Sequence, residues 1–276
     1  MKKIPAFIFF VLSTIFSAKA QFYYKDIISN KQLLTEMALY KQNKVREVNL
    51  KSFEDDGSES EGFFCEKKIS KDYKRSELFT RSDVSGASLF TSLFNSQGQL
   101  LQTNDSSAIS VSVNTYSYDD QGRIKSILST IKSADDDFVN EILEEHIYQY
   151  NDKGLPEKMT RVKNKYDSTV ILFLPDEHGN VSIEKDTKSG SKYYYYYDEK
   201  NRLTDVVHAN EFKQKLLADY LFEYNSAGQV TQMTTTEEGG NYYYIWKYTY
   251  ADGLRSSEKC YSKERHLMGS IQYEYK

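Results

Sequence analysis

The stretch Tyr116-Ser117-Tyr118-Asp119-Asp120-Gln121-Gly122-Arg123-Ile124 decides the fold, because the chain carries seven stricter or looser copies of it. Every copy has two aromatic or apolar residues around a spacer, an acidic or amide turn, a glycine or asparagine, and then an aliphatic residue. Close copies lie at residues 148–155, 195–203 and 222–230, and looser ones at 93–100, 173–181 and 248–254. Such an internal repeat predicts an architecture built from one recurring unit.

The recurring unit is typical of a β-hairpin. An Asp or Asn, such as Asp119, opens a type I turn through its side chain, and a glycine or asparagine three residues later takes the left-handed conformation. The residues expected at that position are Gly122, Gly154, Gly179, Asn201, Gly228 and Gly253. Because consecutive antiparallel strands usually pair, we predict an all-β fold: a long antiparallel β-meander of repeated hairpins that forms a curved or coiled sheet.

The first 20 residues have the layout of a cleaved secretory signal. Lys2 and Lys3 are followed by an apolar stretch over residues 6–16 and by Ala18-Lys19-Ala20. We therefore expect an exported protein that resides in the periplasm or outside the cell. The sequence leaves open which of the two compartments it is.

Residues 21–92 differ from the array of residues 93–276. Leu33, Leu34 and Met37 recur near helical spacing, which predicts a short N-terminal helix over residues 25–42. Irregular strands follow, and we expect this region to cap an edge of the sheet.

Charge and hydropathy exclude several classes of partner. The chain has 36 Lys and Arg against 40 Asp and Glu, a net charge of −4. An acidic chain without a basic cluster is not expected to bind nucleic acid. The mean hydropathy is −0.67, and no apolar stretch after the signal is long enough to form an integral membrane helix.

Two cysteines, Cys65 and Cys260, leave two alternatives open. In an oxidising compartment they can form a disulfide that joins the N-terminal region to the last repeat. They can equally remain two separate buried thiols, because sequence does not give the geometry that a disulfide requires.

The patterns Tyr116-x-Tyr118-Asp119-x-x-Gly122-Arg123-Ile124 and Tyr197-Asp198-x-x-Asn201-Arg202-Leu203 resemble the YD repeat of RHS-type proteins. The resemblance covers about residues 90–276. In that family the hairpins run into a curved or spiralling sheet, which can enclose a toxin domain. This chain has too few repeats for a closed shell and no extension after the last strand, so the resemblance implies a short exported repeat protein without a toxin domain.

Strand alternation gathers aromatic residues on one face of the predicted sheet. Two such runs are Tyr193, Tyr195 and Tyr197, and Tyr242, Tyr244 and Trp246. This face is either the core of the sheet or an exposed platform that binds sugar rings or a partner protein. The six residues named are our candidate ligand-binding residues.

The sequence predicts no catalytic residue, cofactor or metal site. The four histidines lack ligand spacing, and no nucleophile elbow or phosphate-binding loop occurs. The carboxylates gather mainly in turns, including Asp135-Asp136-Asp137, where calcium binding is the weaker interpretation. Glu144, Glu145 and His146 are interpreted as a solvated charged edge.

These observations predict an exported, non-enzymatic binding or structural scaffold of the cell envelope or cell surface. Its aromatic-striped sheet would contact a glycan or an envelope protein. The alternative is a secreted carbohydrate-active enzyme with a carboxylate pair. A third class, the outer-membrane β-barrel, is disfavoured because the strands look polar on both faces.

Overall fold

The computed structural model describes residues 22–134, 141–210, 215–237 and 240–276, so the predicted signal and Asp135–Asp137 lie outside the described residues. Within these ranges there is one helix, α1 (Lys25–Gln42), which confirms the helix predicted there. The strands are β1 (Glu47–Phe53), β2 (Phe64–Ile69), β3 (Arg75–Ser82), β4 (Gly86–Phe94), β5 (Leu100–Ser107), β6 (Ser110–Tyr118), β7 (Ile124–Ser133), β8 (Glu141–Tyr150), β9 (Pro156–Lys163), β10 (Asp167–Pro175), β11 (Val181–Asp186), β12 (Lys192–Tyr197), β13 (Leu203–Asn210), β14 (Lys215–Tyr224), β15 (Val230–Thr236), β16 (Tyr243–Ala251), β17 (Leu254–Tyr261) and β18 (Leu267–Tyr275).

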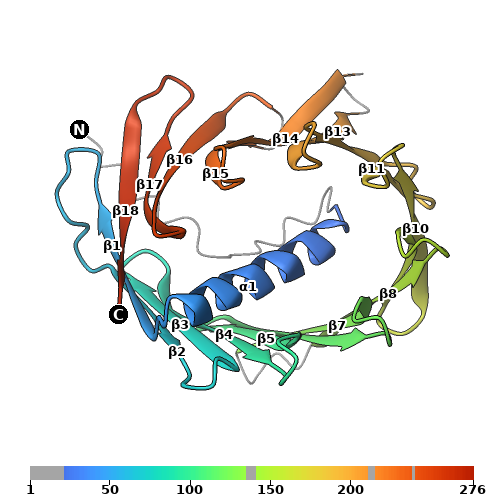
Figure 1. The fold of residues 1–276 in the computed structure, drawn as a ribbon, viewed down its shortest axis with the longest axis horizontal. Helices are drawn as coiled ribbons and strands as arrows, with labels where there is room; N and C mark the ends of the chain where they lie inside the picture. The colour runs from blue at the N-terminus through green and yellow to red at the C-terminus, as the bar shows by residue number, and fades with distance from the viewer. Residues whose placement is uncertain (1–21, 135–140, 211–214, 238–239) are drawn as a thin grey trace.

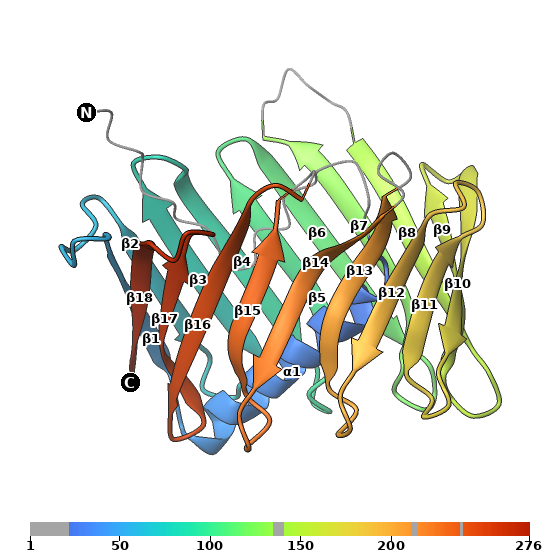
Figure 2. The same cartoon turned by 90° about the horizontal axis from the view of Figure 1, so that it is seen from above.

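The 18 strands form one antiparallel sheet in which each strand pairs with its neighbours in sequence. The predicted all-β meander of hairpins is therefore confirmed. The sheet does more than curve, however: β1 pairs with both β2 and β18, with Val48 opposite Tyr275, and this closes the sheet into a barrel (Figures 1 and 2).

The closed barrel shows that the resemblance to the YD-repeat family was wrong as a guide to this fold. That resemblance implied a coiled sheet with too few repeats to close. The missing strands come from residues before the array, since β1 to β4 belong to the same sheet as the repeats. With an even number of antiparallel strands, the last strand can pair with the first, and closure removes the exposed edges that would otherwise need a cap.

Five of the repeated turns are held by the side chain that opens them. Asp119 Oδ1 accepts the backbone N–H groups of Gln121 (3.0 Å) and Arg123 (2.9 Å), and the Gly122 N–H donates to the Asp119 carbonyl (2.9 Å). The same pair of side-chain bonds occurs at Asn95, Asn151, Asp176 and Asp198. The left-handed positions have positive φ: Gly122 (77°), Gly154 (77°), Gly179 (89°), Asn201 (57°), Gly228 (83°) and Gly253 (80°).

A tyrosine at or next to the end of six strands explains why most copies of the repeat need that residue. Its hydroxyl donates to the backbone carbonyl at the start of the preceding strand, and so links two neighbouring turns along one rim of the barrel. The bonds are Tyr118 to Leu100 (2.8 Å), Tyr150 to Ile124 (2.8 Å), Tyr197 to Val181 (2.9 Å), Tyr224 to Leu203 (2.6 Å), Tyr250 to Val230 (2.7 Å) and Tyr275 to Arg255 (2.7 Å). Phe94 and Pro175 occupy the same position without a hydroxyl.

The barrel interior contains clusters of apolar side chains together with a few buried charged ones, and α1 lies inside it along the wall of β3, β4, β5 and β7 (Figure 1). Leu33, Met37 and Tyr40 of α1 are buried in one cluster with Val48 and Leu50 of β1. The helix thus fills part of the space that the strands enclose. No helix among the described residues is long and apolar enough to cross a membrane.

The outer surface over β1 to β3 and β18 is mostly charged or polar, apart from Phe64 and Phe79, which are exposed and whose rings lie 5.9 Å apart. Its outward positions, which alternate with buried ones, include Glu47, Asn49, Lys51, Glu66, Lys68, Glu77, Arg81, Gln272 and Glu274. Lys51 Nζ lies 2.6 Å from Glu274 Oε1 across β1 and β18, and both side chains are well exposed. Other exposed apolar side chains on the strands include Leu101 of β5, Leu128 of β7, Leu174 of β10, Tyr196 of β12 and Leu221 of β14.

We predict that Tyr224→Phe lowers the free energy of unfolding by about 1 kcal/mol, because it removes one net hydrogen bond at the rim. Urea denaturation followed by circular dichroism measures this change. Tyr196→Phe is the matched control, since Tyr196 is 48% exposed on the outer surface, and it should leave stability unchanged. Equal effects of the two substitutions would contradict a stabilising role for the rim bond.

Candidate functional site

Five of the six candidate ligand-binding residues lie in two separate clusters on the inner wall, and the sixth is exposed. Tyr193 (5% exposed) and Tyr195 (2%) are buried, and Tyr197 is half-buried, all in one cluster. Trp246 is 8% exposed and lies in a separate cluster with half-buried Tyr244. Tyr242 precedes β16 and is 61% exposed. The structure therefore does not gather the six residues into one platform.

Tyr193 and Tyr195 of β12 are buried because the segment before α1 covers them. The Phe22 ring lies 5.6 Å from the Tyr193 ring, and the Tyr24 ring lies 5.3 Å from the Tyr195 ring in an edge-on arrangement. A ligand could reach Tyr193 and Tyr195 only if this segment moved. These two rings are thus part of the core that holds α1 inside the barrel.

Glu184 of β11 fixes the start of α1 from the opposite wall. Its carboxylate accepts the Tyr23 N–H (2.8 Å), the Tyr24 N–H (2.8 Å) and the Tyr195 hydroxyl (2.8 Å). It therefore serves as the N-terminal cap that α1 lacks in its own sequence. Burial raises the Glu184 pKa to about 7, although these three donors act to lower it.

A second buried group, centred on His146 of β8, holds the first turn of α1. His146 Nδ1 lies 2.6 Å from Asp26 Oδ2, and His146 Nε2 lies 2.8 Å from Glu144 Oε1. The Tyr148 hydroxyl donates to the same Asp26 oxygen (2.8 Å). Burial alone would lower the His146 pKa, but the two carboxylates outweigh it and raise the pKa to about 9.

The interpretation of Glu144 and His146 as a solvated edge was wrong, since His146 is 5% exposed. Strand alternation places both residues on the same face as Tyr148, which is part of the aromatic stripe. That spacing is the signal that could have located them inside. Glu184 carried no comparable signal, because two of its three partners, Tyr23 and Tyr24, lie about 160 residues away in sequence.

The middle and end of α1 lie near two further charged pairs. Lys67 Nζ of β2 lies 2.8 Å from Glu36 Oε1, which also accepts the Tyr40 hydroxyl (2.7 Å). On β17, Arg255 lies 3.0 Å from Glu258 Oε2, and the Arg255 guanidinium lies 4.1 Å from the centre of the Tyr248 ring. The inner wall thus combines aromatic rings with paired charges.

No group of His, Cys, Asp and Glu side chains within the described ranges could hold a metal ion. Cys65 and Cys260 are free and buried, and β1 and β18 lie between the strands that carry them. The bridge considered from the sequence is therefore absent from this structure. Burial raises the pKa of both thiols, which disfavours the reactive thiolate.

Comparisons with known proteins supply no family. No family model matches the sequence, which leaves the YD-repeat resemblance without support, and no curated protein matches. Among solved structures, a porin-like protein from Bacteroides uniformis aligns with a TM-score of 0.40 at 12% identity, over 84% of this chain and 96% of that one. The complex TcdB2-TccC3-Cdc42 aligns with a TM-score of 0.28 at 11% identity, over 86% of this chain and 17% of that one. Both likenesses are too weak to assign a function.

We predict that the His146 group makes stability depend on pH. Its pKa is higher in the folded chain than the ordinary 6.5, so its stabilisation is complete below pH 6.5 and is lost as pH rises toward 9. The His146 contribution to the free energy of unfolding should fall over this range by about 3 kcal/mol, and Glu184, with its pKa of about 7, adds a smaller loss near pH 7. Chemical denaturation at pH 6.5, 7.5 and 9 measures the slope.

His146→Gln should remove most of this slope. His178→Gln is the matched control, because His178 lies exposed in a turn and its replacement should leave the slope of the wild type intact. A His146→Gln protein that keeps the full slope would contradict the assignment.

Proposed function

We propose that this chain is an exported, non-enzymatic binding protein of the cell envelope or cell surface, and that it binds a glycan at aromatic side chains on the inner wall of the barrel. One observation carries the proposal: the tyrosine-rich face of the sheet points inward, and α1 covers only part of it. Rings outside that cover, such as Tyr244 and Tyr250, are half-buried. A tyrosine ring offers an apolar face to a sugar, and its hydroxyl oxygen can still accept a hydrogen bond when its proton is donated elsewhere, as that of Tyr250 is to the Val230 carbonyl.

The outer surface favours a barrel surrounded by water. A barrel embedded in lipid needs an outward apolar band around its whole circumference, and a Lys or Arg at the bilayer midplane costs roughly 2–4 kcal/mol. The charged outward positions of β1, β2, β3 and β18 interrupt any such band. The Lys132–Glu141 pair adds charge on the outward side of β7 and β8.

The enzyme alternative has one observation in its favour. Burial raises the Glu184 pKa to about 7, whereas the Asp26 pKa is lowered because the His146 charge outweighs burial. Carboxylates with separated pKa values are typical of acid–base pairs. Both are engaged by groups of the chain itself, which favours a structural role; loss of oligosaccharide hydrolysis in Glu184→Gln, with binding retained, would instead establish the enzyme.

We expect the mature protein to be released from cells without detergent. Osmotic shock or a high-salt wash should bring it into the soluble fraction, because charged outward residues on β1, β2, β3 and β18 interrupt any apolar band around the barrel. A known integral outer-membrane barrel from the same cells is the control and should stay in the pellet. Recovery of the protein only in detergent would contradict a water-surrounded barrel.

Trp246 reports on the inner wall. Since it is 8% exposed, we predict blue-shifted emission and little quenching by acrylamide in the folded protein. Binding of an oligosaccharide to the adjacent rings should change this emission in a saturable way. A screen of cell-envelope oligosaccharides in which none binds, by fluorescence or on an array, would contradict the proposed function.

A further inference from the structure

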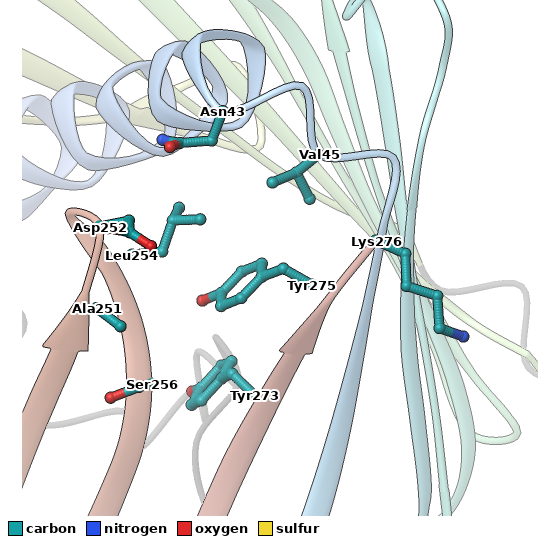
Figure 3. Close-up of a pocket in the computed structure, with 9 residues that line it drawn as sticks. All are labelled: Asn43, Val45, Ala251, Asp252, Leu254, Ser256, Tyr273, Tyr275 and Lys276. Atoms are coloured by element: carbon teal, nitrogen blue, oxygen red, sulfur yellow. The ribbon is translucent and has the colours of Figure 1, made fainter.

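A pocket of about 310 Å³ lies at the end of the barrel where α1 stops. It is bounded by the residues that follow α1, by the turn between β16 and β17, and by the last residues of β18 (Figure 3). The lining residues are Asn43, Val45, Ala251, Asp252, Leu254, Ser256, Tyr273, Tyr275 and Lys276. None of them belongs to the buried networks around Glu184 and His146.

We infer that this pocket binds a single neutral pyranose ring, the terminal or internal unit of a glycan; the inference rests on the proposed function and locates its site. Ligand pockets in proteins span about 300–1,000 Å³. A pocket at the lower end of that range has room for one sugar ring and not for a longer segment buried whole.

The apolar wall of the pocket is made of two fixed tyrosine rings. Tyr273 and Tyr275 lie nearly parallel, at 12°, with their ring centres 6.3 Å apart. The Tyr275 hydroxyl donates to the Arg255 carbonyl (2.7 Å), and its ring also contacts the Tyr40 ring of α1 (6.4 Å). Rings held in this way bind a planar apolar surface without losing further rotational freedom, and the CH face of a pyranose is such a surface.

The polar groups of the pocket suit the hydroxyls of a sugar. Asn43 Nδ2 donates to the Leu39 carbonyl (3.0 Å), which leaves its side-chain oxygen as an acceptor at the pocket. Asp252 lies in the turn between β16 and β17, with φ 53°, and supplies a carboxylate. Hydroxyl groups are the donors that these two acceptors require.

The charge around the pocket argues against an anionic ligand. Lys276 is the lining residue with a cationic side chain, and Figure 3 shows that this side chain points away from the other labelled residues. Its ammonium group donates to Glu47 Oε1 (2.6 Å) on the outer side of β1. A phosphate or carboxylate would therefore meet Asp252 without a facing cation, whereas a neutral sugar would not be repelled.

Asp252→Gly tests the inference without disturbing the turn. Glycine accepts positive φ, and a Gly-Gly pair suits this two-residue turn as well as Asp-Gly does. Asn201→Gly is the matched control, because Asn201 has the same left-handed conformation (φ 57°) in another turn of the barrel. Tyr273→Leu provides a second pocket variant, with its fold checked by circular dichroism.

Saturation-transfer difference NMR with the methyl pyranosides of glucose, galactose, mannose and N-acetylglucosamine supplies the readout. We expect at least one glycoside to bind wild type and Asn201→Gly equally, and to bind Asp252→Gly at least tenfold more weakly, since a hydrogen bond to a charged acceptor is lost. Tyr273→Leu should weaken binding similarly.

The remaining outcomes separate the pocket from the proposed function. If glycosides or oligosaccharides bind all four proteins equally, the pocket is not the site, although the proposed function stands. If no glycoside and no envelope oligosaccharide binds even the wild type, both are overturned.

Discussion

The hydrogen bond from a strand-ending tyrosine to the carbonyl at the start of the preceding strand is the interaction on which the barrel depends. Five of the six tie a turn to the turn before it, and the Tyr275 bond ties the end of β18 to the start of β17. The bond contributes only about 1 kcal/mol, but it recurs around most of one rim and fixes the spacing between neighbouring hairpins. It also explains why the repeat specifies tyrosine and not simply any aromatic residue. Where Phe94 and Pro175 stand in its place, the side chain of the following turn residue still holds the turn.

Local features of the fold could be predicted because local residues determine them. The helix over residues 25–42, the hairpin turns and the shared face of the aromatic residues all follow from spacing and turn chemistry. Closure could not be predicted in this way. Closure depends on the pairing of β1 with β18, where Leu50 lies opposite Tyr273. The sequence of a single repeat does not specify how many strands the closed barrel contains. The strands that complete it lie in a region that does not follow the repeat pattern.

In the candidate site, too, local sequence predicts which face a side chain lies on, whereas its burial depends on residues distant in sequence. Alternation correctly placed Tyr193 and Tyr195 on one face, yet whether they are exposed depends on Phe22 and Tyr24, which approach from the far end of the sequence. Glu184 was missed for the same reason, because an isolated carboxylate on a strand is normally solvated. Glu144 and His146 alternate in step with the aromatic Tyr148 on the same strand. A charged residue that shares a face with aromatic residues in this way is the pattern that predicts a buried charge.

The buried charges inside the barrel have a consequence for how α1 is held. Replacing a buried ion pair with apolar residues is often neutral or stabilising, so such pairs are weak evidence of stability. They do, however, penalise every arrangement in which a partner is missing. Asp26 pairs with His146 near the start of α1, and Glu36 pairs with Lys67 farther along it. A helix shifted by one turn would keep much of its apolar contact but would leave these charges unpaired. The charges therefore specify the position of α1, and through it which part of the aromatic wall is covered and which stays open to a ligand.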